Sequence, residues 1–243
     1  MDDCCGAPPE DHSRRVLAGK LSAGLPLAHS KSVRGYERAC GAGALTASGG
    51  GPTEKRLGTH KSIFFYAGPF RYPNTFCGLL FAPSLEPARR DDGAASPFDS
   101  GGLLKHCQPS NSAEDPKDFL ARHELAIPEH RTYLAQCLER LFDDPWEYVS
   151  GKAPAIPSPI GLTGGDERRW THEVRINSQV PLSSHLKAVF ATLEVIDNHP
   201  SIEKLFRFCA NNGIDRIEID TPGFGTFDTL QRECSDYLKK TIL

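Results

Sequence analysis

Residues 170–176 have the sequence WTHEVRI, in which polar and apolar side chains alternate. Successive side chains of an extended strand point to opposite faces of a sheet. Glu173 and Arg175 therefore share one face of this strand. Val174 and Ile176 occupy the other. The pattern predicts a strand with one polar face, on which a carboxylate and a guanidinium lie next to each other.

Further elements are expected on the C-terminal side of this strand. Residues 186–196 (LKAVFATLEVI) fit both a strand and a helix, and their β-branched content favours a strand. Residues 201–210 are predicted to form a helix that ends before Gly213. A strand at 216–220 and a final helix at 226–240 complete this part.

On the N-terminal side, residues 62–68 (SIFFYAG) and 77–83 (CGLLFAP) predict two strands joined by a short loop. Residues 96–102 (SPFDSGG) combine proline with paired glycines, which favours a tight loop of functional shape. A helix is expected to begin at Pro128 and to pack on the sheet. Its apolar face would consist of Leu134, Cys137, Leu138, Leu141 and Phe142.

These elements predict an α+β fold in which residues 58–243 form a single domain. Residues 1–57 hold few large apolar side chains, and 41–53 (GAGALTASGGGPT) consist mainly of glycine and small residues. Such a run buries too little apolar surface to offset the entropy of ordering it. We therefore expect residues 1–57 to form a flexible arm and linker. The alternative is a short helix near 16–27 that covers the core.

Composition restricts the cellular setting. The eight cysteines include no CxxC pair, which is typical of reduced thiols in a cytoplasmic protein. No run approaches the roughly 18 apolar residues that a membrane span needs, and the N-terminus lacks the features of a signal peptide. The formal net charge of −3 gives no general attraction for nucleic acid, although a local patch could still bind it.

Several catalytic motifs are absent from the sequence. It has no GxxxxGK[ST] phosphate loop, no GxSxG nucleophile elbow and no HExxH zinc motif. The densest set of metal-ligand types matches no zinc spacing, so we predict no metal site there. This set consists of His106, Cys107, His123, His130 and Cys137.

One group of residues has the chemistry needed to break a glycosidic bond to a cationic leaving group such as nicotinamide. A carboxylate can hold a ribose hydroxyl and stabilise an oxocarbenium-like transition state, and an arginine can bind a pyrophosphate. The alternative is that these side chains have core or surface ion-pair roles. The group comprises Tyr66, Gly68, Arg71, Asp99, Ser100 and Glu173.

Residues 170–192 (WTHEVRINSQVPLSSHLKAVFAT) resemble the stretch around the catalytic glutamate of DarT-type ADP-ribosyltransferase toxins. In that family a strand carrying the glutamate is followed by a Val-Pro turn, here Val180 and Pro181. Residues 78–83 (GLLFAP) and 96–97 resemble a second block of the family.

The resemblance implies an ADP-ribosyltransferase-like fold, which is a split, mostly antiparallel sheet that grips NAD. It places Glu173 as the catalytic glutamate, which binds the nicotinamide ribose and activates the acceptor, and Arg71 as the arginine that holds substrate or phosphates. It implies a toxin or antiphage-defence enzyme that consumes NAD by transfer or hydrolysis. The acceptor would be a nucleic-acid base or a protein, and an antitoxin or immunity protein would be a partner. The residues expected to bind NAD are Tyr66, Gly68, Asp99, Ser100 and Arg175.

Two other functions remain open from the sequence. A non-enzymatic binding or immunity protein would dock a partner through exposed aromatics such as Phe98 and Trp146. A metal-dependent nuclease would use Asp215, Glu218 and Asp220, which also fit the solvated side of an amphipathic strand.

Overall fold

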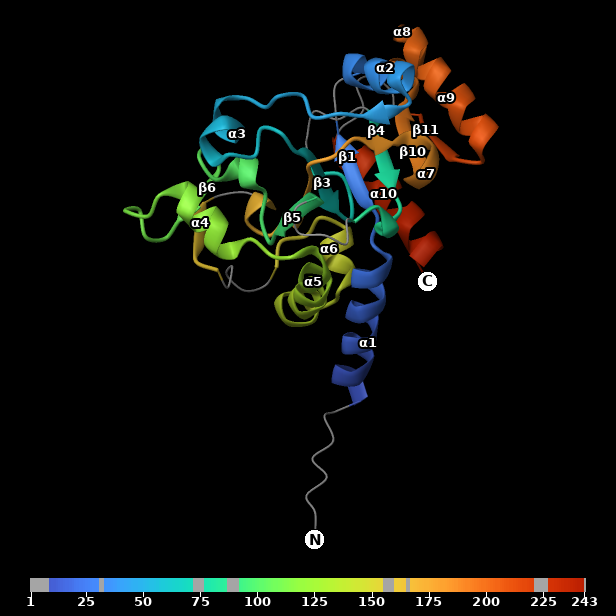
Figure 1. Ribbon diagram of the computed structural model, residues 1–243. Coiled ribbons are helices and arrows are strands. Elements are labelled where there is room, and N and C mark those ends of the chain that lie inside the picture. Colours follow the sequence, from blue (N-terminus) through green and yellow to red (C-terminus); the bar gives the residue numbers. More distant parts are fainter. Residues whose placement is uncertain are drawn as a thin grey trace.

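The computed structural model describes residues 9–30, 33–71, 77–86, 92–154, 160–164, 167–220 and 227–242. They form an α+β fold around an open, mostly antiparallel sheet that is flanked by helices (Figure 1). The main sheet has seven strands in the order β11-β10-β4-β1-β3-β8-β5. These strands are β1 (Leu27–Ser30), β3 (Ile63–Ala67), β4 (Cys77–Phe81), β5 (Gly93–Ser96), β8 (Glu173–Ile176), β10 (Leu186–Thr192) and β11 (Asp215–Ile219).

Strand β8 confirms the strand predicted at WTHEVRI. It pairs antiparallel with β3 on one side and with β5 on the other. Glu173 is opposite both Tyr66 and Ser96, so these three side chains share one face of the sheet. Phe65 and Val174 are opposite each other on the other face, and both are fully buried in the main core. The polar residues of β8 thus point away from that core.

Strand β1 lies in the middle of the sheet, between β3 and β4, in the segment that the sequence predicted to be a flexible arm. Leu27 and Ala28 have no exposed surface. The helix α1 (Pro9–Gly24) precedes β1 and buries Leu21, and α2 (Val33–Ala42) follows it and buries Tyr36. Helix α1 fits the alternative of a helix near 16–27 that covers the core. Composition misses β1 because the strand has only four residues.

The central position of β1 also separates the next two strands in the sheet. β3 and β4 were predicted as consecutive strands joined by a short loop, and both exist. They are not neighbours, however, because each pairs antiparallel with β1. The connection between them lies mostly outside the described residues.

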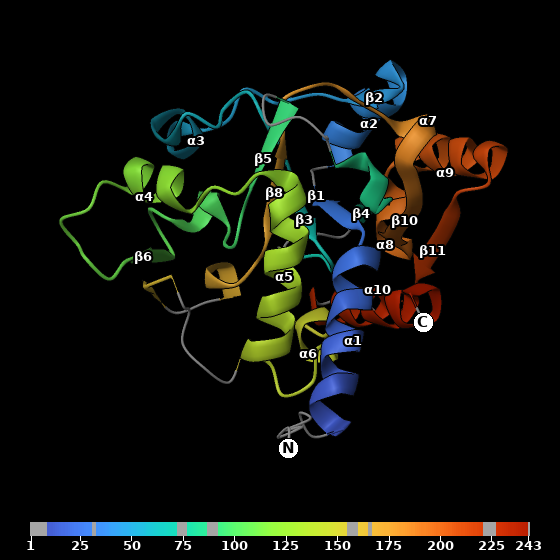
Figure 2. The same cartoon turned by 60° about the horizontal axis from the view of Figure 1, so that its bottom comes forward.

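Helix α5 (Ile127–Leu141) confirms the helix predicted from Pro128. Its apolar side is buried, as expected, and it contacts β5. It also packs along α1, and the two helices lie side by side in Figure 2. Arg131 and Ser22 join them, because each donates a side-chain hydrogen bond to the backbone carbonyl of the other.

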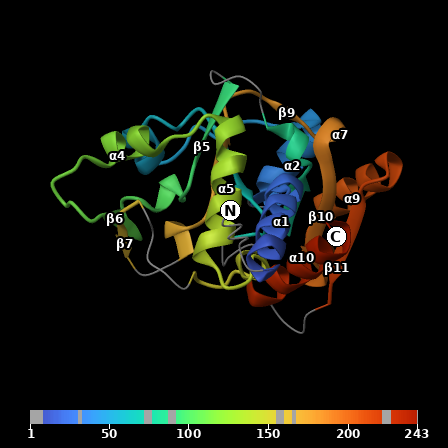
Figure 3. The same cartoon turned by 90° about the horizontal axis from the view of Figure 1, so that it is seen from below.

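The C-terminal part follows the prediction closely. Residues 186–192 form β10, but the remaining residues of the ambiguous run form α8 (Leu193–Asn198), which Thr192 caps. Helix α9 (Pro200–Asn212) ends at Gly213, whose φ of 64° is left-handed. β11 then pairs parallel with β10, and α10 (Phe227–Ile242) closes the described chain (Figure 3).

A second, smaller apolar cluster lies beside the main core. It is built around the two-stranded antiparallel sheet of β6 (Cys107–Pro109) and β7 (Leu162–Gly164), with α3 (Pro52–Leu57) and α4 (Pro116–His123). Its buried members are Leu57, Phe98, Leu103, Cys107, Phe119, Leu120 and Leu162. The remaining short elements are the β2 (Ala44–Leu45) and β9 (Val180–Pro181) pair, α6 (Trp146–Val149), α7 (Leu182–His185), η1 (Pro83–Leu85), η3 (Ser100–Gly102) and η4 (Glu167–Arg169).

Gly78 on β4 gives a direct test of this packing. A Cβ added at Gly78 would lie 2.2 Å from Cε1 of the Phe70 ring. We expect Gly78→Ala to lower the free energy of unfolding by about 1–3 kcal/mol, because the ring must move within a packed core. Gly41→Ala is the matched control, since a Cβ there meets nothing within 4 Å. Denaturant unfolding measures both, and equal stabilities of the two variants would contradict this packing.

Candidate functional site

A cleft of about 190 Å³ opens where β1 and β3 separate. β1 pairs with β3 only through Leu27 and Ala28. The next residue, His29, instead places its Nδ1 2.8 Å from the carbonyl oxygen of Phe64. His29, Phe64 and Tyr66 all line the cleft. The cleft therefore lies at the point where the two halves of the sheet diverge.

The lining of this cleft is polar and carries negative charge. Phe64 and Tyr66 contribute aromatic surface, and Glu54 and Asp99 contribute carboxylates. The described residues that line it include no lysine and no arginine. Such a cleft favours neutral or cationic groups over phosphates. Its hydroxyl groups come from Ser30, Thr46, Ser48, Ser62 and Tyr66.

Glu173 lies directly behind this lining and is fully buried. Its Oε1 accepts a hydrogen bond of 2.6 Å from the Ser100 hydroxyl, and its Oε2 accepts one of 3.2 Å from the Ser100 backbone N–H. Burial and then the nearby charge of Asp99 raise the pKa of Glu173 to about 8, although Arg175 and Ser100 act in the opposite direction. The buried Glu173 carboxyl group thus fixes the position of Ser100 through two hydrogen bonds.

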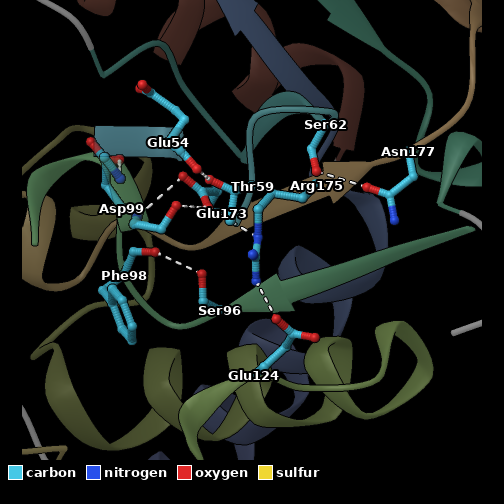
Figure 4. A network of polar contacts seen from close by, with 12 residues as sticks. Glu54, Thr59, Ser62, Ser96, Phe98, Asp99, Glu124, Glu173, Arg175 and Asn177 are labelled. Carbon is cyan, nitrogen blue, oxygen red and sulfur yellow. Dashed lines mark hydrogen bonds and ion pairs between the residues drawn. The ribbon is translucent and has the colours of Figure 1, made fainter. Parts of the chain in front are cut away.

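Asp99 is the carboxylate that reaches the cleft from this network. It caps the short helix η3, where Oδ1 accepts a hydrogen bond of 2.9 Å from the N–H of Gly101. Its Oδ2 lies 3.5 Å from Nε of Arg168. Figure 4 shows Asp99 and Glu173 in one polar network, with Glu54 beside them. The turn that begins at Asp99 is therefore fixed at its N-terminal residue and at Ser100.

Arg175 compensates the buried charge of this network. Its Nε lies 3.3 Å from Oε1 of Glu173, and its Nη2 donates a hydrogen bond of 2.8 Å to Glu124. Only 6% of the Arg175 side chain is exposed, so its charge is poorly screened by water. The expected proximity of Glu173 and Arg175 is confirmed, but the pair is buried rather than on the surface.

The structure brings together five of the seven predicted site residues. Tyr66 and Asp99 line the cleft, whereas Glu173, Ser100 and Arg175 form the buried layer behind it. Tyr66 is joined to this layer through the strand pairing of β3 with β8.

Arg71 and Gly68 do not line the cleft. Arg71 donates a hydrogen bond of 2.8 Å to the carbonyl of Tyr148, and its guanidinium lies 4.6 Å from the centre of the Tyr148 ring. Gly68 has a φ of 110°, and a Cβ added to it would lie 3.1 Å from the same ring. Both residues therefore pack around Tyr148.

Sequence reasoning missed the cleft residues that come from the N-terminal segment. His29, Thr46, Ser48 and Glu54 all belong to the part expected to be flexible. One signal for order was available in residues 51–54 (GPTE), because a proline in the first turn and a glutamate three residues after the cap are typical of a helix start. Glu54 does bind the backbone N–H of Gly51 at 2.6 Å.

The other candidate residues do not assemble into a site. His130 lies 3.1 Å from His172 in a buried pair, and burial lowers the pKa of both rings. Cys107 and Cys137 lie in the two apolar clusters. Across the described residues, no group of three histidine, cysteine or acidic side chains is placed to hold a metal ion.

The exposed aromatic surface expected for a docking protein is not found in the described ranges. Phe98 is fully buried against Phe119, with ring centres 5.6 Å apart. Trp146 is partly buried and packs on the main core. Asp215 and Glu218 are exposed on β11, and Asp220 follows them in an equally exposed position.

None of the helices within the described ranges combines the length and the apolar character that a membrane crossing requires. Comparisons with protein-family models, with curated proteins and with solved structures find no match to this chain.

Proposed function

We propose that this chain breaks the N-glycosidic bond of NAD and transfers the ADP-ribose to an acceptor or to water, as an ADP-ribosyltransferase-like enzyme. The observation that carries the proposal is the acidic cleft over a buried carboxylate. Asp99 lies at its wall, Glu173 lies behind it, and the described lining has no lysine or arginine to oppose a positively charged ring. The likeness of residues 170–192 to DarT-type toxins gives separate support.

The chemistry follows from the charge of the leaving group. When the bond between C1′ of the ribose and the pyridinium nitrogen breaks, its electron pair neutralises that nitrogen. Positive charge then develops on the ribose ring as an oxocarbenium ion. The Asp99 carboxylate stabilises this charge from the cleft wall. The acceptor forms the new bond to C1′ and releases a proton.

The other lining groups have binding roles in this proposal. The rings of Phe64 and Tyr66 provide a surface for the nicotinamide, and the hydroxyls of Ser48 and Ser62 can bind the ribose hydroxyls. Ligand clefts commonly have volumes of about 300–1000 Å³, and this one has about 190 Å³. The cleft is thus too small for the whole dinucleotide, so the proposal places only the nicotinamide riboside end in it.

The roles of two predicted residues change. Glu173 has no exposed surface, so it acts by holding Ser100 and hence the turn that begins at Asp99. Arg71 binds Tyr148 rather than the cleft, so the phosphate-binding role implied by the resemblance is not part of the proposal.

The test is nicotinamide release from NAD by the purified protein, measured by chromatography. NAD labelled on its adenylate part, added with DNA, RNA or cellular protein, identifies the acceptor by uptake of label. Absence of nicotinamide release under all these conditions would reject the proposal.

Blocking the cleft should reduce this activity. Ser48 is exposed and lines the cleft, so Ser48→Trp fills it without disturbing the core. We expect kcat/KM for nicotinamide release to fall at least about tenfold, because the substrate can no longer be positioned. Ser183→Trp, at an exposed residue of α7 outside the cleft, is the control and should leave the rate unchanged. Equal rates in the two variants would place the reaction elsewhere.

A further inference from the structure

The two edge strands of the main sheet differ in whether another described segment pairs with their outer side. At one end, the outer side of β5 is closed by the chain itself. Ala95 donates a backbone hydrogen bond of 3.1 Å to Leu125 and accepts one of 2.8 Å from it. At the other end, β11 pairs with β10, and no segment within the described ranges pairs with its outer side. An open strand edge presents a row of backbone donors and acceptors for another strand.

The faces of β11 are supported by the two last long helices. Arg216 places its guanidinium 5.7 Å from the centre of the Phe206 ring on α9. The preceding residue, Asp215, accepts a hydrogen bond of 2.8 Å from the Tyr237 hydroxyl on α10. Because successive residues of a strand point to opposite faces, α9 and α10 brace β11 from both sides. The strand is thus held in an extended form, and no described segment pairs with its outer edge.

The sequence of β11, DRIEI, is complementary to itself in an antiparallel pair. With a two-fold axis at Ile217, Arg216 of one copy lies opposite Glu218 of the other, and the reverse pair forms by symmetry. Directly opposite residues share a face, so their side chains can form ion pairs. Arg216 and Glu218 are both exposed, and Ile217 is half-buried, so all three are accessible to a partner strand.

We propose that β11 is the contact surface for a second copy of this chain. The two β11 strands pair antiparallel about Ile217 and join the two main sheets into one continuous sheet. Such a two-fold contact is self-complementary and closes on itself, which gives a dimer rather than a filament. The inference does not depend on the proposed function. The short strand predicts weak association, which requires measurement at high protein concentration.

The test uses charge reversal on the full chain, with mass measured by analytical ultracentrifugation between ~10 and ~500 µM. The wild type should dimerise as concentration rises. Arg216→Glu places Glu opposite Glu, and Glu218→Arg places Arg opposite Arg, so each variant alone should remain a monomer. An equal mixture of the two should form a heterodimer, because complementary charges then face each other. The double variant R216E/E218R should dimerise like the wild type.

Two outcomes would overturn the proposal. A second measurement, by cross-linking, tests it even if a charge-reversal variant misfolds. A wild type that is monomeric over the whole range, or single variants that dimerise as it does, would reject the β11 contact. Ile217→Cys should form a disulfide with its own copy when oxidised glutathione is the oxidant, and peptide mapping would identify the cross-link between the two substituted strands. Arg207→Cys, at an exposed residue of α9, is the control and should not cross-link in this way.

Discussion

Asp99→Asn is expected to lower kcat/KM for nicotinamide release by about 10²- to 10³-fold. The substitution keeps the size of the side chain but removes the negative charge that stabilises the developing oxocarbenium ion, and such electrostatic contributions commonly have this magnitude. Steady-state kinetics with NAD measures the effect. The loss should appear mainly in kcat, because the charge develops only in the transition state.

A matched control for Asp99→Asn exists in the same chain. Asp115 also caps a helix, and it accepts a hydrogen bond of 2.8 Å from the backbone N–H two residues later, as Asp99 does at 2.9 Å. Asp115 lies outside the cleft, and asparagine is an equally good cap. Asp115→Asn should therefore leave both stability and activity unchanged. A loss of activity in it equal to that in Asp99→Asn would assign the effect to helix capping.

Glu173→Gln distinguishes the role of the Glu173 carboxylate from that of the Asp99 carboxylate. An amide at this position can accept a hydrogen bond from the Ser100 N–H and donate one to its hydroxyl oxygen, so we expect a smaller loss than for Asp99→Asn. If Glu173→Gln abolishes nicotinamide release in a stable protein while Asp99→Asn retains it, Glu173 is the group that contacts the substrate. The assignment implied by the resemblance would then replace ours.

Arg175→Met should destabilise the protein more than Gly78→Ala does. Arg175 faces Glu173 at 3.3 Å and Glu124 at 2.8 Å, with 6% of its side chain exposed. Where Glu173 is ionised, at alkaline pH, removing its buried partner leaves an uncompensated charge and costs about 3–5 kcal/mol of stability. Arg207→Met is the control, because the Arg207–Glu203 pair is largely exposed and is worth less than about 1 kcal/mol. Urea unfolding measures these variants.

The cost of Arg175→Met should depend on pH. The pKa of Glu173 is raised to about 8 in the folded protein, so this group is mostly protonated at pH values well below 8 and ionised above it. Arg175→Met therefore leaves a buried charge at alkaline pH and a neutral carboxyl at acidic pH. We expect the destabilisation to grow as pH rises through about 8. The double variant R175M/E173Q should lose this growth, and a destabilisation independent of pH would contradict the pairing.

The sequence predicts elements well where a periodic pattern is long or a strand alternates cleanly. WTHEVRI identified β8 and the shared face of Glu173 and Arg175, and the apolar face around Leu138 identified α5. β1 was missed because LAHS is too short to show a period, and its burial comes from strands that are distant in sequence. Local composition does not predict such pairing.

The sequence also indicated only part of the candidate site, because contacts between segments distant in sequence leave no local pattern. Asp99, Ser100 and Glu173 were grouped from their chemistry and do lie together, and β8 places Glu173 beside Tyr66 by strand register. The layering of these residues depends on the turn that begins at Asp99, which only the three-dimensional arrangement reveals. Arg71 was chosen for its position after β3, but the chain turns it toward Tyr148.

The position of β1 has a consequence for how the chain folds. Of the described strands β1 is synthesised first, yet its partners are residues 66–67 of β3 and 78–81 of β4, which follow much later in the chain. The middle of the sheet therefore forms only by closing loops of several tens of residues, and contacts of this range slow folding. Until β3 and β4 have emerged, the edges of β1 have no partners. The nascent chain thus relies on the helices around β1 to keep it from pairing elsewhere.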